Sequence, residues 1–452
     1  MKATPIDRRA RRTAAAIFLA LVVIYNANGR EIGTVDSQPA KFTARELAVV
    51  GTLTLDRVVA ERPGLAERPA FAKDRQGHVR SAYPLPPALI AAVPATVLHH
   101  SGLVDMDAPL APNLVAKLTA SLLTAAAVTL MFLAVRRLVR HSVALLTALA
   151  IGIGTNYWSV VSQTLWQHES VALGLALALW AWLRPLSEIR SRDLWLGGLG
   201  LALAGAARPQ VAPLVAILLG WLGARVGVRK TIPPAAIMGL AALVSLVCNY
   251  VWFGHLLGAA PRLEAVHPET HGLEGTISTT PWVGALGLLI SPSRGLLVFS
   301  PFVLVALAAR RLPATTSGMF ALRWLAAGIV VQFAVYAGYT VWWGGHTYGP
   351  RYTMDLIAPM APAIALGLER AASVAWARIA VGLLLLWSIV VAGAGAFVYP
   401  NDAWNTSPAE VDRAHHRLWE VRDSQIPRVW RSGSSPQNFD LFSAEAVRRP
   451  AS

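Results

Sequence analysis

The side chains with the chemistry of an active site lie in short polar stretches between long apolar runs. The first is Asp36, in the stretch NGREIGTVDSQPAKF, shortly after the first apolar run. A carboxylate beside a membrane can accept a proton from a hydroxyl group and act as a general base. A solvated loop acid or a helix cap is the alternative for an isolated Asp here. Asp36 is therefore a candidate that needs partners from elsewhere in the chain.

Three arginines stand at positions suited to a phosphate group. Arg208 follows a very short apolar run, Arg294 lies in LLISPSRGLLVFSPF, and Arg351 lies in WWGGHTYGPRYTMD. Burying an arginine near a membrane is costly without a partner, and phosphate matches its planar fork of donors. The alternatives are snorkelling of Arg208, an interfacial anchor at Arg294, and an ion pair of Arg351 with Asp355 four residues later.

Two other polar stretches add histidine and aromatic side chains. His346 and Tyr352 flank Arg351, where the aromatic residues form either an interfacial belt or a wall for stacking sugars. His168 and Glu169 lie in SQTLWQHES. The pair resembles two metal ligands, but adjacent residues do not share a helix face and no HExxH spacing occurs, so the pair alone does not define a metal site and metal binding stays open.

The composition shows what must position these groups. The chain has 452 residues, of which 55% are hydrophobic and 14% charged, whereas soluble proteins carry about 25% charged residues. Apolar runs near the ~20 residues of a bilayer-spanning helix recur along the chain. The expected fold class is an all-α polytopic membrane protein. The single cysteine, Cys248, excludes an intramolecular disulfide and a Cys-based metal site.

The apolar runs predict about eleven transmembrane helices, at residues 13–27, 114–135, 142–161, 170–183, 194–207, 210–224, 232–252, 295–309, 319–341, 353–368 and 377–398. SAYPLPPALIAAVPATVLHH is short and rich in proline, so we expect a juxtamembrane or re-entrant helix there. The arginine-rich connections then share one side, which the positive-inside rule makes cytoplasmic. This rule accounts for the net charge of +15 without nucleic acid. The N-terminus is expected in the cytoplasm, as an uncleaved signal anchor.

One integral-membrane domain, residues 1–452, is expected. It has a first outer loop at 28–112 that carries juxtamembrane helices, a second outer loop at 253–294, and an outer C-terminal tail at 399–452. Thr43 and Glu46 have the spacing of a capping box, which predicts a helix from there to about Ala60. The candidate residues all fall on the outer side.

The order of these features resembles the GT-C superfamily of integral-membrane glycosyltransferases. It is similar to the bacterial branch with lipid A aminoarabinose transferases and protein mannosyltransferase-like enzymes. The resemblance rests on the early Asp, the YPxxPP segment, a span ending in an ARRL-type sequence and an ARP step. GTNYWSVVSQTLWQHES, LLISPSRGLLVFSPF and WWGGHTYGPRY also resemble a bacterial group within it. The resemblance covers nearly the whole chain.

The resemblance implies a sugar donor linked to polyprenyl phosphate, used at the outer face of a bacterial plasma (inner) membrane. The acceptor would be a glycan, lipid or protein, and membrane lipid would surround the chain. In the family the early loop acid is the catalytic base, which corresponds to Asp36. A second carboxylate often follows it, but Ser37 stands here, so Glu169 is the candidate to supply it. This departure leaves the need for a divalent metal open.

Two other classes of function compete with this hypothesis. A transporter or flippase of a lipid-linked or anionic substrate needs midplane charges and broken helices in paired positions, but these spans are poor in midplane charge. A non-catalytic scaffold of envelope assembly is the third. Convergence of Asp36, Glu169, Arg294 and Arg351 on one outer cavity would favour the enzyme.

Overall fold

Helices make up most of the structure, a computed structural model that describes residues 8–260, 276–278, 280–311 and 316–449. The predicted second outer loop lies partly outside these residues, as does the start of the predicted signal anchor. The described strands β1 (Phe71–Lys73) and β2 (Val79–Ser81) pair antiparallel in the first outer loop. The all-α fold class is therefore confirmed.

The α-helices are α1 (Arg8–Asn26), α2 (Gln38–Val50), α3 (Asp56–Glu61), α4 (Pro86–His100), α5 (Ala111–Val135), α6 (His141–Gly154), α7 (His168–Trp182), α8 (Ser191–Ala207), α9 (Ala212–Val226), α10 (Val228–Phe253), α13 (Pro281–Ile290), α14 (Leu296–Phe299), α15 (Thr316–Ala337), α16 (Ile357–Ala371), α17 (Ala375–Val398) and α18 (Gln425–Ser432). Shorter helical turns are η1 (Val35–Ser37), η2 (Pro63–Leu65), the π-helical η3 (Tyr157–Val161), η4 (Leu186–Glu188), η5 (Pro209–Val211), η6 (Pro301–Arg311), η7 (Tyr352–Leu356), η8 (His415–Trp419), η9 (Asp440–Phe442) and η10 (Ala444–Ala446).

Several helices have the length and apolar composition of membrane spans. Among the described residues, five meet both criteria: Ala111–Val135, Pro209–Val226, Val228–Phe253, Phe320–Ala337 and Ala375–Val398. The chain is thus a polytopic membrane protein. Every segment predicted as a span coincides with helix, although residues 295–309 form the short α14 followed by the 3₁₀ turns of η6. The number of crossings, eleven, stays a prediction.

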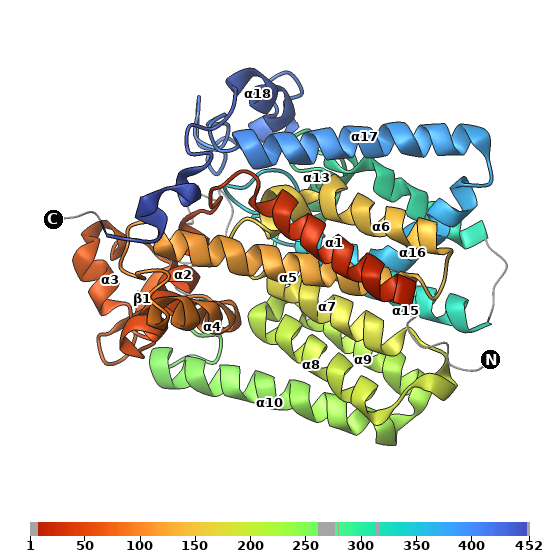
Figure 1. Cartoon of the computed structure of the whole chain (residues 1–452), viewed down its shortest axis with the longest axis horizontal. Helices are drawn as coiled ribbons and strands as arrows, with labels where there is room; N and C mark the ends of the chain where they lie inside the picture. The colour runs from red at the N-terminus through yellow and green to blue at the C-terminus, as the bar shows by residue number, and fades with distance from the viewer. Residues whose placement is uncertain (1–7, 261–275, 279, 312–315, 450–452) are drawn as a thin grey trace.

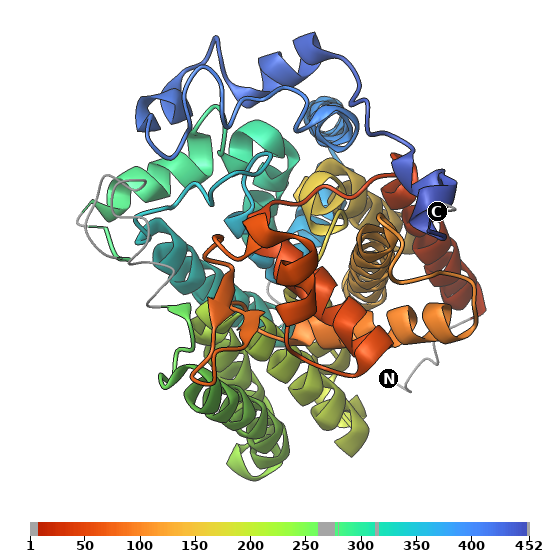
Figure 2. The same ribbon diagram turned by 90° about the vertical axis from the view of Figure 1, so that its left-hand side faces the viewer.

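The long helices lie side by side, and the polar segments gather at one end of them (Figure 1). Helices α2, α3 and α4 with strand β1 lie at this end, and the C-terminal tail comes down beside them (Figure 2). The 15-residue α4 packs here against α2. Its length and place agree with the juxtamembrane interpretation of the proline-rich segment.

Small residues allow close helix packing behind the polar end. A Cβ on Gly174 of α7 would lie 2.3 Å from the carbonyl oxygen of Gly200 in α8, so the two backbones touch. Such small-residue contacts are typical of membrane helix pairs. The contact fixes α7, whose first two residues are His168 and Glu169.

The predicted capping box in the first outer loop is wrong. Helix α2 begins at Gln38, with Pro39 in its first turn, where proline is favoured. Thr43 therefore lies in the interior of α2 and not at its N-cap, and its side chain is buried. The helix ends at Gly51, whose φ of +70° forms a left-handed C-cap, well before Ala60. Glu46 is buried and pairs with Arg57 at 3.0 Å.

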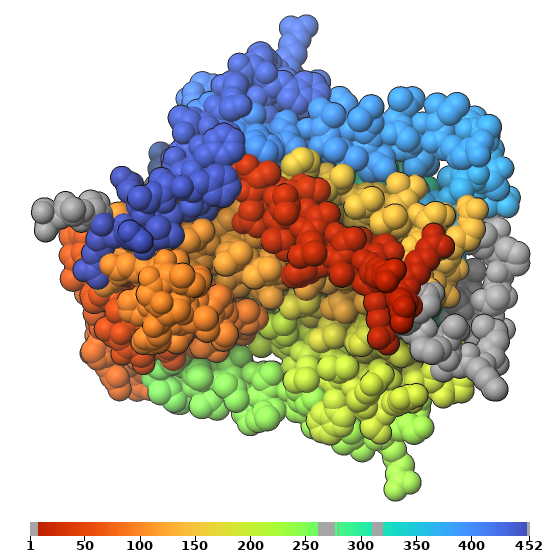
Figure 3. All heavy atoms as spheres, in the orientation of Figure 1, coloured from red at the N-terminus to blue at the C-terminus, as the bar shows by residue number. Residues whose placement is uncertain are grey.

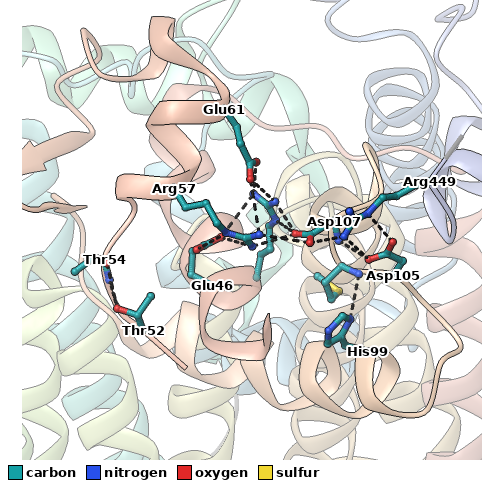
Figure 4. A network of polar contacts seen from close by, with 11 residues as sticks. Glu46, Thr52, Thr54, Arg57, Glu61, His99, Asp105, Asp107 and Arg449 are labelled. Atoms are coloured by element: carbon teal, nitrogen blue, oxygen red, sulfur yellow. Dashed lines mark hydrogen bonds and ion pairs between the residues drawn. The ribbon is translucent and has the colours of Figure 1, made fainter. Parts of the chain in front are cut away.

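An ion-pair network holds the C-terminal tail against the first outer loop (Figure 4). Asp107 pairs with Arg45 and with Arg57, at 2.6 and 3.0 Å. Arg449 of the tail pairs with the same Asp107 and with Asp105. The network therefore links α2, α3 and the loop between α4 and α5 to the end of the described chain.

Candidate active site

The turn η1 presents Asp36 at the polar end of the molecule, with its side chain 42% exposed. The hydroxyl of Tyr83 donates to Asp36 Oδ1 at 2.8 Å. Burial and the neighbouring Asp36 carboxylate raise the pKa of Tyr83 well above its ordinary value, so its proton stays in place as a donor. Asp36 is therefore both oriented and open to solvent.

Arg351 approaches Asp36 from the other half of the chain. Its Nη1 lies 3.6 Å from Asp36 Oδ2. The guanidinium is held over the rings of Trp166 and Tyr352, at 4.8 and 5.5 Å from their centroids. Its Nε is buried and has no hydrogen-bond partner among the described residues. Arg351 thus offers a donor direction that the protein does not use.

The ion pair between Arg351 and Asp355, the alternative to a phosphate-binding role, does not form. Residues 352–356 adopt the 3₁₀ turn η7, which has three residues per turn, so the four-residue spacing of an α-helix does not apply. Asp355 is buried and pairs instead with Arg208, at 3.1 Å, and with His168 Nδ1, at 2.7 Å. Tyr336 also donates to it.

Tyr352 connects the two arginines. Its ring stacks on Tyr336, with centroids 5.2 Å apart and planes inclined by 20°. The guanidinium of Arg208 lies 5.2 Å from the centroid of the Tyr352 ring, and the guanidinium of Arg351 lies 5.5 Å from the same centroid. The structure therefore joins five predicted residues and Asp355 into one continuous group, hereafter the outer cluster: Asp36, Arg351, Tyr352, Arg208, Asp355 and His168.

Glu169 is next to the outer cluster in sequence but does not reach Asp36 in any described contact. It is buried, its Oε1 accepts from Ser170 at 3.2 Å, and its Oε2 has no partner among the described residues. The preceding Gln167 has a φ of +77°, an uncommon conformation for a residue other than glycine. Such strain concentrates at functional sites. A role for Glu169 beside Asp36 stays a prediction.

Arg294 is not part of the outer cluster. It is fully buried, and each of its five N–H donors has a protein acceptor. These acceptors are the carbonyls of Trp343 (2.9 Å), Ser293 (2.8 Å) and Gly345 (3.0 Å) and the side chains of Gln425 (2.6 Å) and Asn405 (2.7 Å). Because no donor is left for a phosphate, we assign Arg294 to holding the tail against the 343–345 loop.

His346 also faces the tail. Its Nε2 lies 3.2 Å from Asp412 Oδ2, and Trp343 donates to the other oxygen of this carboxylate at 2.7 Å. These two donors outweigh burial and lower the pKa of Asp412. The contacts that the structure describes for His346 do not reach the outer cluster, so its role in binding substrate stays a prediction.

Sequence reasoning missed three aromatic members of this site. Tyr83 orients Asp36, Trp166 carries Arg351, and Tyr336 bonds to Asp355. Trp166 lies in the polar stretch SQTLWQHES and Tyr83 lies in the proline-rich segment that begins SAYPLPP, and these two positions were the available signal. Tyr336 lies inside an apolar span, where nothing in the sequence sets it apart.

A metal site is not evident in the residues present. Over the described ranges, no group of three or more His, Cys, Asp or Glu side chains is arranged to hold an ion. The pair His168 and Asp355 has Arg208 as its third partner, and a cation repels a metal ion. We therefore assign no set of metal ligands among the described residues.

Comparisons with known proteins concern the fold. No protein-family model and no curated protein sequence matches the chain. The apo oligosaccharyltransferase of Archaeoglobus fulgidus has a similar structure, with a TM-score of 0.49 and 12% identity over 94% of this chain. ArnT from Cupriavidus metallidurans, solved with undecaprenyl phosphate, gives 0.45 and 13% over 92% of this chain. The chain covers 61% of the first protein and 73% of the second.

Proposed function

We propose that the chain is a membrane glycosyltransferase. It moves a sugar from a polyprenyl-phosphate donor, the class that the resemblance implies, to an acceptor hydroxyl on the outer face. The observation that carries the proposal is the pairing of Asp36, a half-exposed carboxylate, with Arg351, a buried arginine that keeps a free donor. A carboxylate that can act as a base and an arginine that can bind an anion thus occur in one group of residues.

Asp36 acts as the general base in this proposal. The acceptor oxygen attacks the anomeric carbon while its proton passes to an oxygen of Asp36. The bond from the anomeric carbon to the phosphate oxygen breaks, and polyprenyl phosphate leaves with the electron pair. Attack opposite to the leaving group inverts the anomeric configuration. The hydrogen bond from Tyr83 holds the carboxylate in position for this step.

Arg351 stabilises the leaving group. Negative charge grows on the phosphate as the bond breaks, so a fixed cation there favours the transition state over the ground state. The stacking on Trp166 and Tyr352 holds the guanidinium before the donor binds. Arg208 adds a second positive charge, because its guanidinium also packs on the Tyr352 ring. An ion pair with Asp355 and a hydrogen bond to the Tyr336 hydroxyl keep Arg208 in place. Removing one such donor from an active site typically costs about 10²–10³ in kcat.

The apolar surface of the helices suits the lipid part of the donor. Only 6% of the apolar part of α10 is buried within the protein, and most of the apolar part of α17 is also exposed at the protein surface. These faces meet membrane lipid, and a prenyl chain has the same chemistry. The phosphate and the sugar would then reach the outer cluster from the bilayer surface.

The proposal is tested by transfer of label. Membranes that contain the chain are incubated with radiolabelled polyprenyl-phosphate sugars, and covalent label is followed into lipid, glycan and protein fractions. The enzyme hypothesis expects label in one acceptor fraction, dependent on the chain. Movement of intact labelled donor across the bilayer without covalent transfer would instead identify a flippase and overturn the proposal.

A further inference from the structure

A cavity of about 680 Å³ opens between the first outer loop and the C-terminal tail. This volume lies within the usual range of ligand pockets. Its charged lining residues are four cations and two anions, a balance of +2: Arg30, Lys41, Arg62, Arg68, Glu31 and Asp440. None of these residues has a role in the proposed chemistry, so the cavity is a candidate site for a ligand other than the lipid-linked donor.

Arg30 indicates the charge of that ligand. It lines the cavity yet is only 2% exposed, and its Nη2 donates to the carbonyls of Ala396, at 3.0 Å, and Tyr399. Its Nε and Nη1 have no partner among the described residues. Burial lowers the pKa of Arg30 to about 10, which leaves it charged at neutral pH. Buried charged donors without acceptors are costly, and an anionic oxygen would satisfy them.

The two acids in the lining do not cancel this preference. Glu31 pairs with Lys41 at 3.1 Å and accepts from Thr164, so its charge is already matched. Asp440 of the tail acts on Arg30 electrostatically, but no hydrogen bond or ion pair joins them among the described residues, so Nε and Nη1 of Arg30 stay unpartnered. Arg62 and Arg68 are exposed and have no carboxylate partner in the described ion pairs. They therefore remain available to an anion that enters from solvent.

The position of the cavity favours a polar, water-soluble group over a lipid chain. Its lining comes from the loop between Arg30 and Arg68, from Leu110 and Asn113 at the start of α5, and from the tail. No lining residue lies in the middle of a span. Amide side chains that can bond sugar hydroxyls also face it: Gln38, Asn113 and Gln437.

The same short segment that carries Asp36 forms part of the wall, through Gly33, Val35 and Gln38. An occupant of the cavity would thus lie next to the proposed base. The tail supplies the opposite wall. It is pinned there by backbone hydrogen bonds from Phe439 to Asn28, at 2.9 Å, and from Leu441 to Gly29, at 2.8 Å. Figure 3 shows the tail lying across the first outer loop.

We propose that this cavity is the acceptor site and that the acceptor is a carbohydrate carrying an anionic group, a phosphate or a carboxylate, bound by Arg30, Arg62 and Arg68. The inference rests on the proposed function and names the substrate class that it leaves open. The lipid-linked donor binds separately, at the outer cluster.

Binding of small probes to the full-length chain in nanodiscs tests the site without any need for catalysis. Calorimetry compares digalacturonate and trehalose 6-phosphate with neutral maltose, and the two anionic probes distinguish carboxylate from phosphate. We expect at least one anionic probe to bind about ten-fold more tightly than maltose, since a charge-assisted contact contributes about 1.4 kcal/mol or more. Equal binding of the neutral and anionic probes would overturn the inference.

Variants locate the binding. Because Arg30 is buried and its loss can unfold the loop, the test uses the exposed pair, Arg62→Gln with Arg68→Gln. This double variant is expected to weaken the anionic probe about ten-fold or more and leave the unfolding temperature unchanged. Arg75→Gln is the matched control, since Arg75 is an exposed arginine of the same loop that does not line the cavity. Unchanged binding in the double variant would overturn the site.

The proposed function and the acceptor site can fail separately. Asp36→Asn should bind the anionic probe as the unmodified chain does, because Asp36 does not line the cavity. Anion binding without any sugar transfer would overturn the function and retain the site. Sugar transfer with an unchanged acceptor KM in the Arg62 and Arg68 double variant would retain the function and overturn the site.

Discussion

The guanidinium of Arg351 lies 3.6 Å from the carboxylate of Asp36, although the two residues come from opposite parts of the chain. Asp36 follows the first helix, whereas Arg351 follows the ninth predicted span. The contact brings the first outer loop to the start of η7 and places a cation beside the proposed base. The rest of the outer cluster extends inward from this pair through Tyr352 to Asp355.

Arg351→Ala should lower kcat by about 10²–10³ and weaken donor binding, because the cation that meets the leaving phosphate is lost. Arg351→Lys keeps the charge but loses the planar fork and the stacking on Trp166. Its activity should therefore lie between that of the unmodified chain and that of Arg351→Ala. Titration of the lipid-phosphate donor measures both effects. Unchanged donor KM and kcat in the alanine variant would remove Arg351 from the site.

Tyr83→Phe should keep the fold and lower kcat by about ten-fold. The ring still packs, but Asp36 loses the hydrogen bond that orients it, and a hydrogen bond to a charged group contributes about 1.5–3 kcal/mol. The donor KM should change little, since the hydroxyl of Tyr83 donates its hydrogen bond to Asp36 and not to a donor-binding residue. Steady-state kinetics separate the two parameters. A wild-type kcat would show that Asp36 needs no help from this hydroxyl.

Arg294→Ala tests stability. It removes five hydrogen bonds and leaves buried acceptors unpaired, so the free energy of unfolding should fall by about 3 kcal/mol or more. Thermal unfolding in nanodiscs measures the loss. The folded fraction should still bind donor normally. A variant with unchanged stability but no donor binding would restore Arg294 as a phosphate ligand.

Asp402 in the tail predicts a pH dependence of stability. Burial raises the pKa of Asp402 to about 6 from an ordinary value of 3.8, so the native state holds this proton more tightly than the unfolded chain. This group's contribution to stability therefore decreases as the pH rises from about 4 to 6 and is level above that. Asp402→Asn should be more stable than the unmodified chain at pH 7, by up to about 3 kcal/mol.

The difference between the Asp402→Asn variant and the unmodified chain should shrink as the pH is lowered from 7 to 5. Unfolding temperatures measured at both values give the comparison. A difference that stays constant or grows toward pH 5 would contradict the assignment of this titration to Asp402.

The fold and part of the site follow from the sequence because the membrane constrains them strongly. Long apolar runs must be helical in a bilayer, since no water satisfies the backbone there. The arginines at their ends assign a side to each connection. Asp36, Arg208 and Arg351 were therefore predicted on the same face, and the structure brings them into one group.

What the sequence does not show is the choice of partner. Arg294 looked like Arg351, a lone arginine at the entrance of a helix, but Gln425 and Asn405 of the tail occupy its donors. Asp355 stands four residues after Arg351, yet the 3₁₀ turn directs it to Arg208. Such outcomes depend on contacts between distant segments, which neither residue type nor local spacing encodes.

The Asp36→Asn variant tests the central claim most directly. It keeps the size of the side chain but removes the base, and Asp56→Asn is the matched control, because the two side chains are 42% and 44% exposed in the same loop. Transfer of labelled sugar from polyprenyl phosphate should fall to background in Asp36→Asn, at wild-type expression and unfolding temperature, and persist in Asp56→Asn. Near-normal turnover in Asp36→Asn would contradict the account.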